Sequence, residues 1–309
     1  MNIHASLATL PQPRFLMCPP RHFAVTYSIN PWMDPKSWAD SGAELHATAG
    51  RQWKGLHRAL LRHGAAIETV APAPGLPDLV FTANAAVVLD GKALLARFRH
   101  PERRREEPAY AAAFRALKAR GLIGEISEMP DGLALEGAGD CLWDNARGLF
   151  WMGCGFRSDA AASAVVEERF GVPCVPLALA DPSFYHLDTA FCPLPCGGVI
   201  YYPGAFTPEA LARIEALVAP GERIALDKSD AAHFAANAVC FGRVIVLSSG
   251  SGTLRASLKQ RGCTVVQTPL DAFLRSGGSA CCLTLRLDRS SQPAGAEAVT
   301  APRAAAGRA

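Results

Sequence analysis

Short apolar runs separated by turns recur along most of the chain. Each pair of runs is preceded by polar residues, and the pairs lie within residues 84–97, 139–153, 188–204 and 237–250. In the first pair Asp90–Gly91 stands between the two runs, which is a strong sequence signal for a β-hairpin. We therefore expect four hairpins, with an opening strand within 14–20 and a closing strand within 279–288.

Helical patterns fall between these hairpins. They begin near Ser, Thr, Asp, Pro or acidic residues and end at Gly, and they cover residues 41–64, 106–121, 157–171, 207–221 and 252–262. A short apolar run typical of a strand follows each helix. A ββαβ unit thus recurs about five times with a period of roughly fifty residues, and such repetition predicts an array of one supersecondary unit. A five-bladed ring is its simplest closure, and one open mixed α/β sheet is the alternative.

The composition is that of a globular protein. The chain has 309 residues, half of them hydrophobic, which is enough for one large core or two ordinary domains. The net charge of +3, with acidic and basic residues mixed along the chain, gives no case for nucleic acid or an anionic membrane as a partner. No apolar run approaches the roughly 18–20 residues that span a bilayer. The N-terminus also lacks the pattern of a signal peptide.

The cysteines and the C-terminal segment indicate the compartment and the extent of the folded domain. Ten cysteines without an export signal suggest free thiols in a reducing cytoplasm. No CxxC pair has a matching His or Cys pair, so we expect no structural zinc site. Residues 289–309 are rich in Ala, Pro, Gly and Ser, and this composition predicts disorder. We therefore expect one folded domain over residues 14–288.

Polar residues stand at the entrance of every predicted hairpin. They are Asn84, Glu136 with Asp140, His186 with Asp188, Asn237, and the pair Cys281–Cys282. In a ring of equivalent units, equivalent positions converge on the axis. The repeat therefore predicts that these side chains meet in one central pocket.

Each of these residues also has a plain structural interpretation. Asn84 and Asn237 are typical turn formers, and His186 would serve equally as a hydrogen-bonded core imidazole. Glu136 at an apolar strand end is harder to explain without a cationic partner.

The adjacent cysteines pose a separate question. Neighbouring side chains of a strand point to opposite faces, which would give Cys281 and Cys282 different roles, one packing and one chemical. Gly277–Gly278 just before them indicates that another group approaches the backbone closely here.

Four segments resemble, in order and spacing, the signatures of the guanidino-group-modifying superfamily. They are PDLVFTANAAVV (77–88), LEGAGD (135–140), YHLDTAF (185–191) and GGSACCLTL (277–285). This superfamily includes arginine deiminase, dimethylarginine dimethylaminohydrolase, arginine dihydrolase and glycine amidinotransferase. Residues 17–34, which include Asn30, look most like the N-terminus of bacterial dimethylarginine-hydrolase-like and arginine dihydrolase members. The resemblance implies a five-bladed α/β propeller, the pentein fold.

The resemblance also implies roles for single residues. Cys282 matches the nucleophile, His186 the general acid/base, and Glu136 the carboxylate beside the guanidinium. Cys281 would then be packing. The implied substrate-binding residues are Asn84, Asp188, Arg103, Arg157 and Asn30, with solvated surface arginine as the alternative for Arg103 and Arg157. No metal or organic cofactor is implied.

These inferences predict a cytoplasmic, cofactor-free hydrolase of arginine or Nω-methylated arginine. It would release ammonia and give citrulline or ornithine through a covalent thiouronium intermediate on Cys282. Asn84 stands where deiminases and dimethylarginine hydrolases carry Asp and where arginine dihydrolases carry Asn, so it favours the dihydrolase. Dimethylarginine hydrolysis, amidino transfer to an amine, and a non-catalytic arginine-binding propeller are the alternatives. The expected partner is the small-molecule substrate, and assembly into a homo-oligomer stays open.

Overall fold

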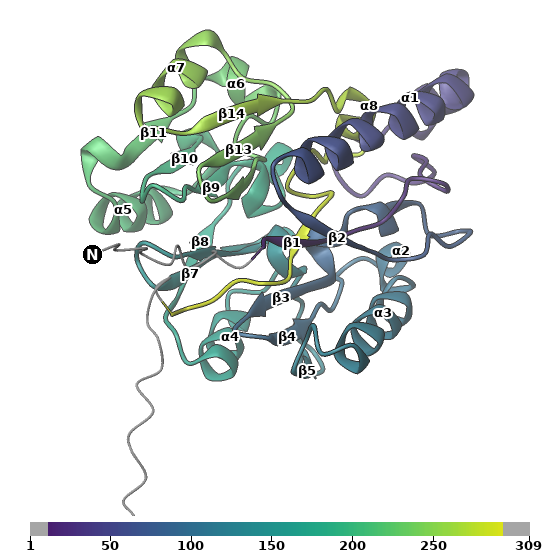
Figure 1. The fold of residues 1–309 in the computed structure, drawn as a ribbon, viewed down its shortest axis with the longest axis horizontal. Helices are drawn as coiled ribbons and strands as arrows, with labels where there is room; N and C mark the ends of the chain where they lie inside the picture. Colours follow the sequence, from purple (N-terminus) through teal and green to yellow (C-terminus); the bar gives the residue numbers. More distant parts are fainter. Residues whose placement is uncertain (1–11, 293–309) are drawn as a thin grey trace, which may run out of the picture.

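Five small sheets make up the frame of the molecule. The computed structural model describes residues 12–292, and the helices lie outside the strands (Figure 1). In each three-stranded sheet the middle strand pairs antiparallel with one neighbour and parallel with the other. The sheets are β3 (Ala86–Leu89), β4 (Lys92–Leu95), β5 (Glu125–Glu128); β6 (Cys141–Asp144), β7 (Leu149–Cys154), β8 (Cys174–Ala178); β9 (Phe191–Pro193), β10 (Val199–Tyr201), β11 (Arg223–Ala225); β12 (Val239–Phe241), β13 (Val244–Leu247), β14 (Thr264–Gln267); and β15 (Leu285–Arg286), β1 (Arg14–Met17), β2 (Ala66–Thr69).

A helix connects the middle strand of each sheet to its parallel neighbour. These helices are α1 (Pro35–Arg62), α3 (Glu107–Ala119), α4 (Ala162–Phe170), α5 (Pro208–Leu217) and α7 (Gly252–Gln260). Shorter helices lie in other connections, namely α2 (Pro101–Arg104), α6 (Lys228–Ala232) and α8 (Asp271–Leu274). The ββαβ unit therefore occurs five times, and the predicted five-bladed α/β propeller is confirmed. The alternative of one open sheet is wrong.

The helix α3 buries one face against its own sheet. In α3 the buried residues are Tyr110, Phe114 and Leu117, a spacing of four and three that lines up on one side of a helix. They pack in one cluster with Ala93 and Leu95 of β4.

One predicted helix start was wrong and another was incomplete. The helix α1 has a kink at Ser41, where φ is −132° and ψ is 18°, so the predicted start at 41 marks its longer second segment. A short first segment begins at Pro35, because the Asp34 side chain accepts hydrogen bonds from the backbone N–H groups of Lys36 and Ser37. Such a cap satisfies donors that the first turn leaves unpaired. The helix predicted from 157 begins only at Ala162. The five residues before it, 157–161, form a loop instead, which leaves Arg157 free to reach inward.

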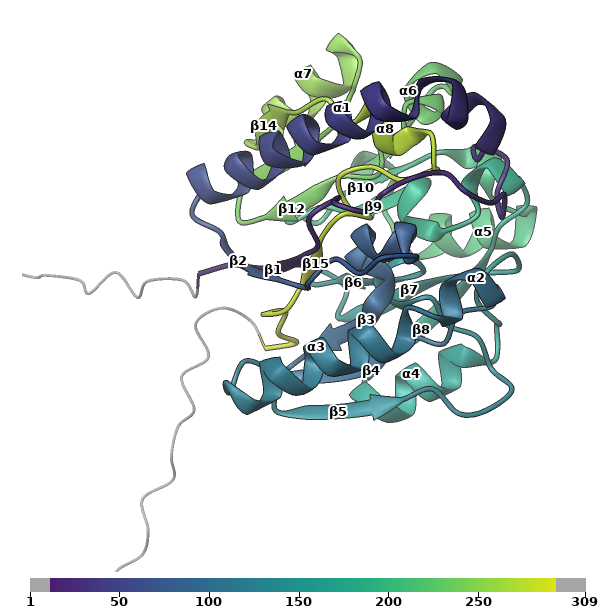
Figure 2. The ribbon, with the colours of Figure 1, turned by 90° about the vertical axis from the view of Figure 1, so that its right-hand side faces the viewer.

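The two ends of the described chain meet in one sheet, and this pairing closes the ring. The strand β15 pairs antiparallel with β1, with Leu285 opposite Leu16 (Figure 2). The backbone N–H of Leu287 also donates to the Arg14 carbonyl over 2.9 Å. The expected closing strand over 279–288 is largely wrong, since only Leu285–Arg286 is extended. Residues before it bend into a turn in which Leu283 N–H donates to the Ser279 carbonyl.

The ordered chain continues a few residues past 288. Asp90 and Gly91 both have positive φ, 52° and 70°, as the central residues of a two-residue hairpin turn require. The Asp90 carboxylate at this turn accepts hydrogen bonds from Ser290 and Ser291. The folded part thus includes the start of the segment 289–309 that we predicted to be disordered, while residues 293–309 lie outside the described residues.

Two further features are the state of the cysteines and the length and hydropathy of the described helices. All ten cysteines are free thiols, so each is a possible acid, nucleophile or packing group. Between residues 12 and 292, the longest and most apolar helices still fall short of what a membrane crossing needs.

Closure by β1 predicts a large cost for truncating its buried side chain. Leu16 is almost fully buried in the cluster that contains Leu285, so Leu16→Ala should lower the free energy of unfolding by about 2–5 kcal/mol. Leu61, which is 46% exposed, is the matched control, and Leu61→Ala should change stability by less than about 0.5 kcal/mol. Urea denaturation measures both, and equal effects would show that β1 does not hold the ring closed.

Candidate active site

Tight turns at the hairpin entrances bring the predicted polar residues together. The 3₁₀ turns η2 (Thr82–Ala85) and η5 (Leu187–Thr189) both pack against η3 (Gly137–Gly139). The turn that holds Cys282 joins them, because the Cys282 carbonyl accepts a hydrogen bond from Ala83 N–H over 3.1 Å. The repeat therefore delivers one polar turn per blade to a shared centre.

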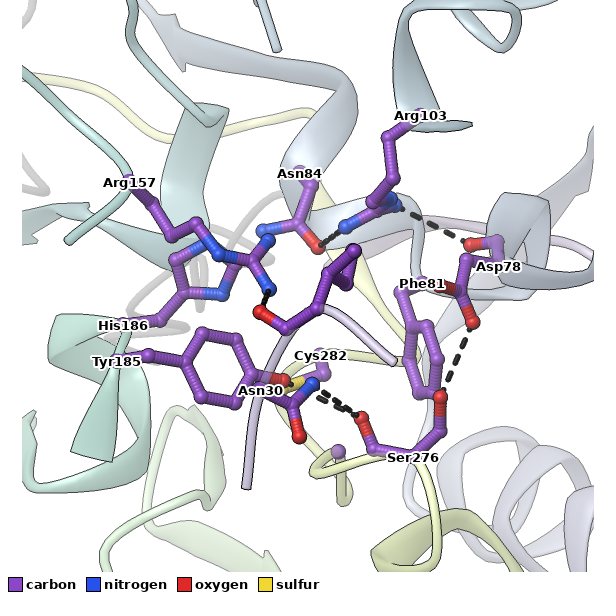
Figure 3. A pocket seen from close by; sticks show the side chains of 12 residues that line it. Asn30, Asp78, Phe81, Asn84, Arg103, Arg157, Tyr185, His186, Ser276 and Cys282 are labelled. Carbon is purple, nitrogen blue, oxygen red and sulfur yellow. Dashed lines mark hydrogen bonds between the residues drawn. The ribbon is translucent and has the colours of Figure 1, made fainter. Parts of the chain in front are cut away.

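A narrow cavity lies at this centre (Figure 3). Its lining contains six of the eight predicted site residues, namely Asn30, Asn84, Arg103, Arg157, His186 and Cys282. The other two, Glu136 and Asp188, lie just behind the lining and contact it through hydrogen bonds. All eight predicted residues thus belong to one connected site.

The Glu136 carboxylate is the most deeply buried of these groups, with no exposed surface. His186 Nε2 and Arg157 Nη1 donate to its Oε2 over 2.8 and 2.9 Å, and Arg99 N–H donates to Oε1 over 3.2 Å. Burial alone would raise the pKa of Glu136, but the charges of Arg157 and His186 outweigh it and hold that pKa well below its usual range. Glu136 is therefore ionised.

A second carboxylate fixes the loop that carries His186. Asp140 accepts hydrogen bonds from Leu187 N–H over 3.0 Å and from the Ser158 hydroxyl over 2.6 Å. Burial raises the pKa of Asp140 to about 6, although the nearby His186 lowers it. Asp140 thereby links the loop before α4 to the histidine.

The thiol of Cys282 lies between a carboxylate and an amide. It donates to Asp188 Oδ2 over 3.1 Å, and Asn237 Nδ2 donates to its sulfur over 3.1 Å. Burial and the Asp188 charge both raise the pKa of Cys282 well above its ordinary value. Burial also raises the pKa of Asp188 to about 7, against the hydrogen bond from Cys282. These surroundings favour the neutral thiol of Cys282, and positive charge nearby would favour the thiolate.

Cys281 and Cys282 differ in position, but not for the reason that strand alternation gave. Both lie in a turn, where Asn237 Oδ1 accepts from their backbone N–H groups over 2.9 and 3.2 Å. Cys282 is buried and lines the cavity, whereas Cys281 is half-buried away from it. Asn237 is thus more than a turn former, because it orients both the backbone and the sulfur of this turn.

The glycine pair before the turn allows two aromatic rings to approach. A side chain at Gly277, whose φ is +77°, would overlap the Tyr185 hydroxyl, and one at Gly278 would overlap the Phe81 ring. Tyr185 also donates to the Gly277 carbonyl over 2.8 Å. The close approach predicted from the two glycines is present, and the approaching groups are aromatic side chains.

The two arginines are buried, so their interpretation as solvated surface residues is wrong. Arg103 is 3% exposed and donates to Asn84 Oδ1 over 2.8 Å. Arg157 is 2% exposed, lies over the Tyr185 ring and donates to the Ile29 carbonyl over 3.0 Å. Both present guanidinium groups to the cavity (Figure 3).

Hydrogen bonds of Asn30 hold the N-terminal segment beside the cavity. Its amide donates to the Ser276 carbonyl over 3.1 Å and its oxygen accepts from Trp32 N–H over 2.9 Å. Because Ser276 leads into the turn of Cys282, this contact places the segment against the loop that carries Cys282.

Sequence reasoning missed several lining residues. They are Ile29, Asp78, Phe81, Tyr185 and Ser276. Asp78 is buried and accepts hydrogen bonds from Tyr27 over 2.7 Å and from Ser276 over 3.1 Å. Both Asp78 and Tyr185 stand inside the segments that carried the family resemblance, so position in those segments was the available signal.

No metal site accompanies this cavity in the described part of the chain. Between residues 12 and 292, no group of three or more His, Cys, Asp or Glu side chains is placed to hold a metal ion. The chemistry that the arrangement offers is that of a thiol, an imidazole–carboxylate pair and two guanidinium groups.

The ring of five ββαβ units agrees with the pentein fold that the family resemblance implies. The model of the family described as N,N dimethylarginine dimethylhydrolase, eukaryotic, matches residues 20–289. The chain belongs to this dimethylarginine dimethylaminohydrolase family.

Two curated relatives show what the chain is similar to. It is 43% identical to the bifunctional arginine dihydrolase/ornithine cyclodeaminase AgrE of Nostoc sp., over 89% of this chain but only 38% of AgrE. It is 38% identical to the N(G),N(G)-dimethylarginine dimethylaminohydrolase of Mycobacterium tuberculosis, over 89% of this chain and 85% of that protein. The chain therefore spans well under half the length of the bifunctional relative.

A solved structure gives the same relationship in three dimensions. The N-terminal domain of ArgZ, an arginine dihydrolase of cyanobacteria, superposes with a TM-score of 0.84 at 40% identity. The match covers 91% of this chain and 100% of that domain, which is a cysteine-to-serine mutant bound to its substrate.

The contact between Cys282 and Asp188 predicts a change in thiol reactivity. Asp188→Asn removes the negative charge that raises the pKa of Cys282, so Cys282 should react faster with iodoacetamide at pH 8. Each pKa unit lost gives about tenfold more thiolate. Peptide mass spectrometry measures the rate at Cys282, and the exposed Cys196 in the same sample is the internal reference. An unchanged ratio of the two rates would remove Asp188 from the control of this thiol.

Proposed function

We propose that this chain is a cysteine-dependent arginine hydrolase that hydrolyses its substrate twice, to ornithine. The observation that carries the proposal is the setting of Asn84. An amide stands here at a position where a carboxylate would suit a deiminase, which stops after one hydrolysis. Its Oδ1 accepts from Arg103, and its Nδ2 donates to the Glu136 carbonyl over 3.1 Å. A carboxylate would place an acceptor against that carbonyl, whereas an amide satisfies both neighbours.

The cavity is suited to an α-amino acid with a guanidinium side chain. Arg103 and Arg157 offer N–H donors for an α-carboxylate, and charge-assisted hydrogen bonds of this kind are the strong ones. Asp78 is the one acidic side chain among the described lining residues, and we assign it to the α-ammonium group. The guanidinium would then extend toward Cys282.

The carboxylate behind Cys282 is prepared for a cation. Asp188 Oδ1 is buried and has no hydrogen-bond partner among the described residues, a costly state that a guanidinium N–H relieves. Once the substrate cation pairs with Asp188, the charge that opposes thiolate formation is neutralised. Substrate binding thus activates the nucleophile in this scheme.

The first hydrolysis uses Cys282 and His186 in turn. The sulfur bonds to the guanidinium carbon, His186 protonates a terminal nitrogen, and the C–N bond breaks to release ammonia. His186 then takes a proton from water, whose oxygen attacks the thiouronium carbon. The C–S bond breaks, and citrulline forms with the thiol restored. The ionised Glu136 beside His186 stabilises the imidazolium that appears in both steps.

The second hydrolysis needs citrulline to stay bound. Citrulline is neutral and presents a carbonyl oxygen, which a carboxylate at position 84 would repel and an Asn84 N–H can hold. Sulfur attack on this carbon releases the second ammonia, and water then cleaves the thioester-like bond. The resulting carbamate breaks down to carbon dioxide and ornithine, so arginine and two waters give ornithine, two ammonia and carbon dioxide.

Hydrolysis of dimethylarginine to citrulline and dimethylamine is the second candidate. The family match and the similarity to the Mycobacterium tuberculosis enzyme favour it. The same thiol, imidazole and carboxylates would serve, so only substrate choice separates it from the first candidate. For either reaction, we place the protein in the cytoplasm, where its free thiols would stay reduced.

Product analysis tests the proposed function. The native protein should convert arginine to ornithine and two equivalents of ammonia, and Asn84→Asp should stop at citrulline. Mass spectrometry of the amino acid products, with ammonia and methylamines measured in parallel, distinguishes these outcomes. Cys282→Ser supplies the blank, because it should form no product.

Three results would contradict this assignment. Citrulline as the sole product of the native protein would make it a deiminase, and release of dimethylamine from dimethylarginine alone would favour the second candidate. Amidino transfer to an added amine would identify a transferase.

A further inference from the structure

Most of the N–H donors of Arg103 are already used by other groups of the protein. Its Nε and Nη2 donate to the two oxygens of Glu106 over 3.0 and 2.8 Å, and Nη2 also donates to the Asp78 carbonyl over 3.2 Å. Its Nη1 donates to Asn84 Oδ1, and its guanidinium lies over the Phe98 ring. A guanidinium has five N–H donors, so one donor, on Nη1, has no partner among the described residues.

Glu106 is the group that fixes this orientation. It has no exposed surface, and both hydrogen bonds of its carboxylate go to Arg103. The pair is bidentate, a geometry that holds the plane of the guanidinium as well as its position. Glu106 itself is held by the chain, since its N–H donates to the Arg103 carbonyl and its own carbonyl accepts from Tyr110 N–H.

A buried ion pair of this kind is weak evidence for a role in stability. Removing two charges from water costs several kcal/mol per ion, and their attraction often does no more than offset that cost. To bind a carboxylate in the cavity, however, Arg103 must turn one Nη1 donor inward while its other Nη1 donor stays on Asn84. The Glu106 clamp on the far side of the guanidinium satisfies that requirement.

We propose that Glu106 is a positioning residue that sets recognition of the substrate α-carboxylate by holding Arg103 with its free donor toward the cavity. The proposal rests on the proposed function in one respect, that the ligand is an amino acid with a guanidinium side chain. It concerns binding at the carboxylate end and not the chemistry at Cys282. Glu106 touches no substrate and acts only through Arg103.

A comparison of two ligands separates this role from a merely structural one. Agmatine has the arm and guanidinium of arginine but lacks the α-carboxylate. In a Cys282→Ala background, which blocks turnover, Glu106→Gln should weaken arginine binding by about 10-fold or more, the scale of charged hydrogen bonds. Agmatine binding should change by less than about 2-fold, because its contacts do not involve Arg103. Isothermal titration calorimetry measures both dissociation constants.

Two further variants keep the test decisive. Glu102 is an exposed carboxylate on α2, the helix that carries Arg103, so Glu102→Gln removes the same charge nearby and should leave both affinities unchanged. Glu106→Asp keeps the charge but shortens the side chain, and it should weaken arginine binding selectively but by a smaller factor. If Glu106→Gln does not fold, the Asp variant provides the same comparison.

The outcomes also separate this proposal from the proposed function. Equal weakening of arginine and agmatine, or no weakening of either, would overturn the role of Glu106 even if the native protein makes ornithine. Selective loss of arginine binding would support that role even if the native protein makes another product. Failure of the Cys282→Ala parent to bind arginine would overturn it, because no carboxylate would then be recognised.

Discussion

Each buried carboxylate inside this ring needs hydrogen-bond donors against it. Arg157 and His186 donate to Glu136, and Arg103 donates to Glu106. Such groups would otherwise be too costly to bury. Asp188 has no cation hydrogen-bonded to it, since its Oδ2 accepts from the Cys282 thiol and its Oδ1 has no partner among the described residues. A guanidinium would supply a positive charge at this carboxylate.

The fold makes this concentration of charge possible. Each blade contributes a polar turn, and the blades are linked to one another by side chains that cross the centre, as Asp140 does to the Leu187 backbone. The apolar positions that form the sheets and pack the helices surround this centre with buried side chains. The low dielectric that makes an unpaired charge costly also makes a well-placed partner effective.

The repeating pattern of the chain was sufficient to predict the ring, because each ββαβ unit repeats its own turn and helix signals. It was insufficient where a few residues change direction. The sequence pattern around Cys281 and Cys282 predicts the start of a strand. Their backbone N–H groups instead donate to Asn237, which is distant in sequence, and these hydrogen bonds hold the segment in a turn. The sequence pattern predicts that a helix starts at Arg157. The residue lies in a loop instead, and its side chain donates a hydrogen bond to Glu136. Asp78 and Tyr185 gave no periodic signal, because what places them in the cavity is the closure of the ring.

The central claim is that the Cys282 sulfur forms a covalent bond with the guanidinium carbon of arginine. The most direct test is to quench the native protein with acid during turnover of arginine and to locate the adduct by tandem mass spectrometry. We expect an added mass of arginine less ammonia on Cys282 and an unmodified Cys281. An adduct on any other cysteine, or turnover of arginine without one on Cys282, would contradict it.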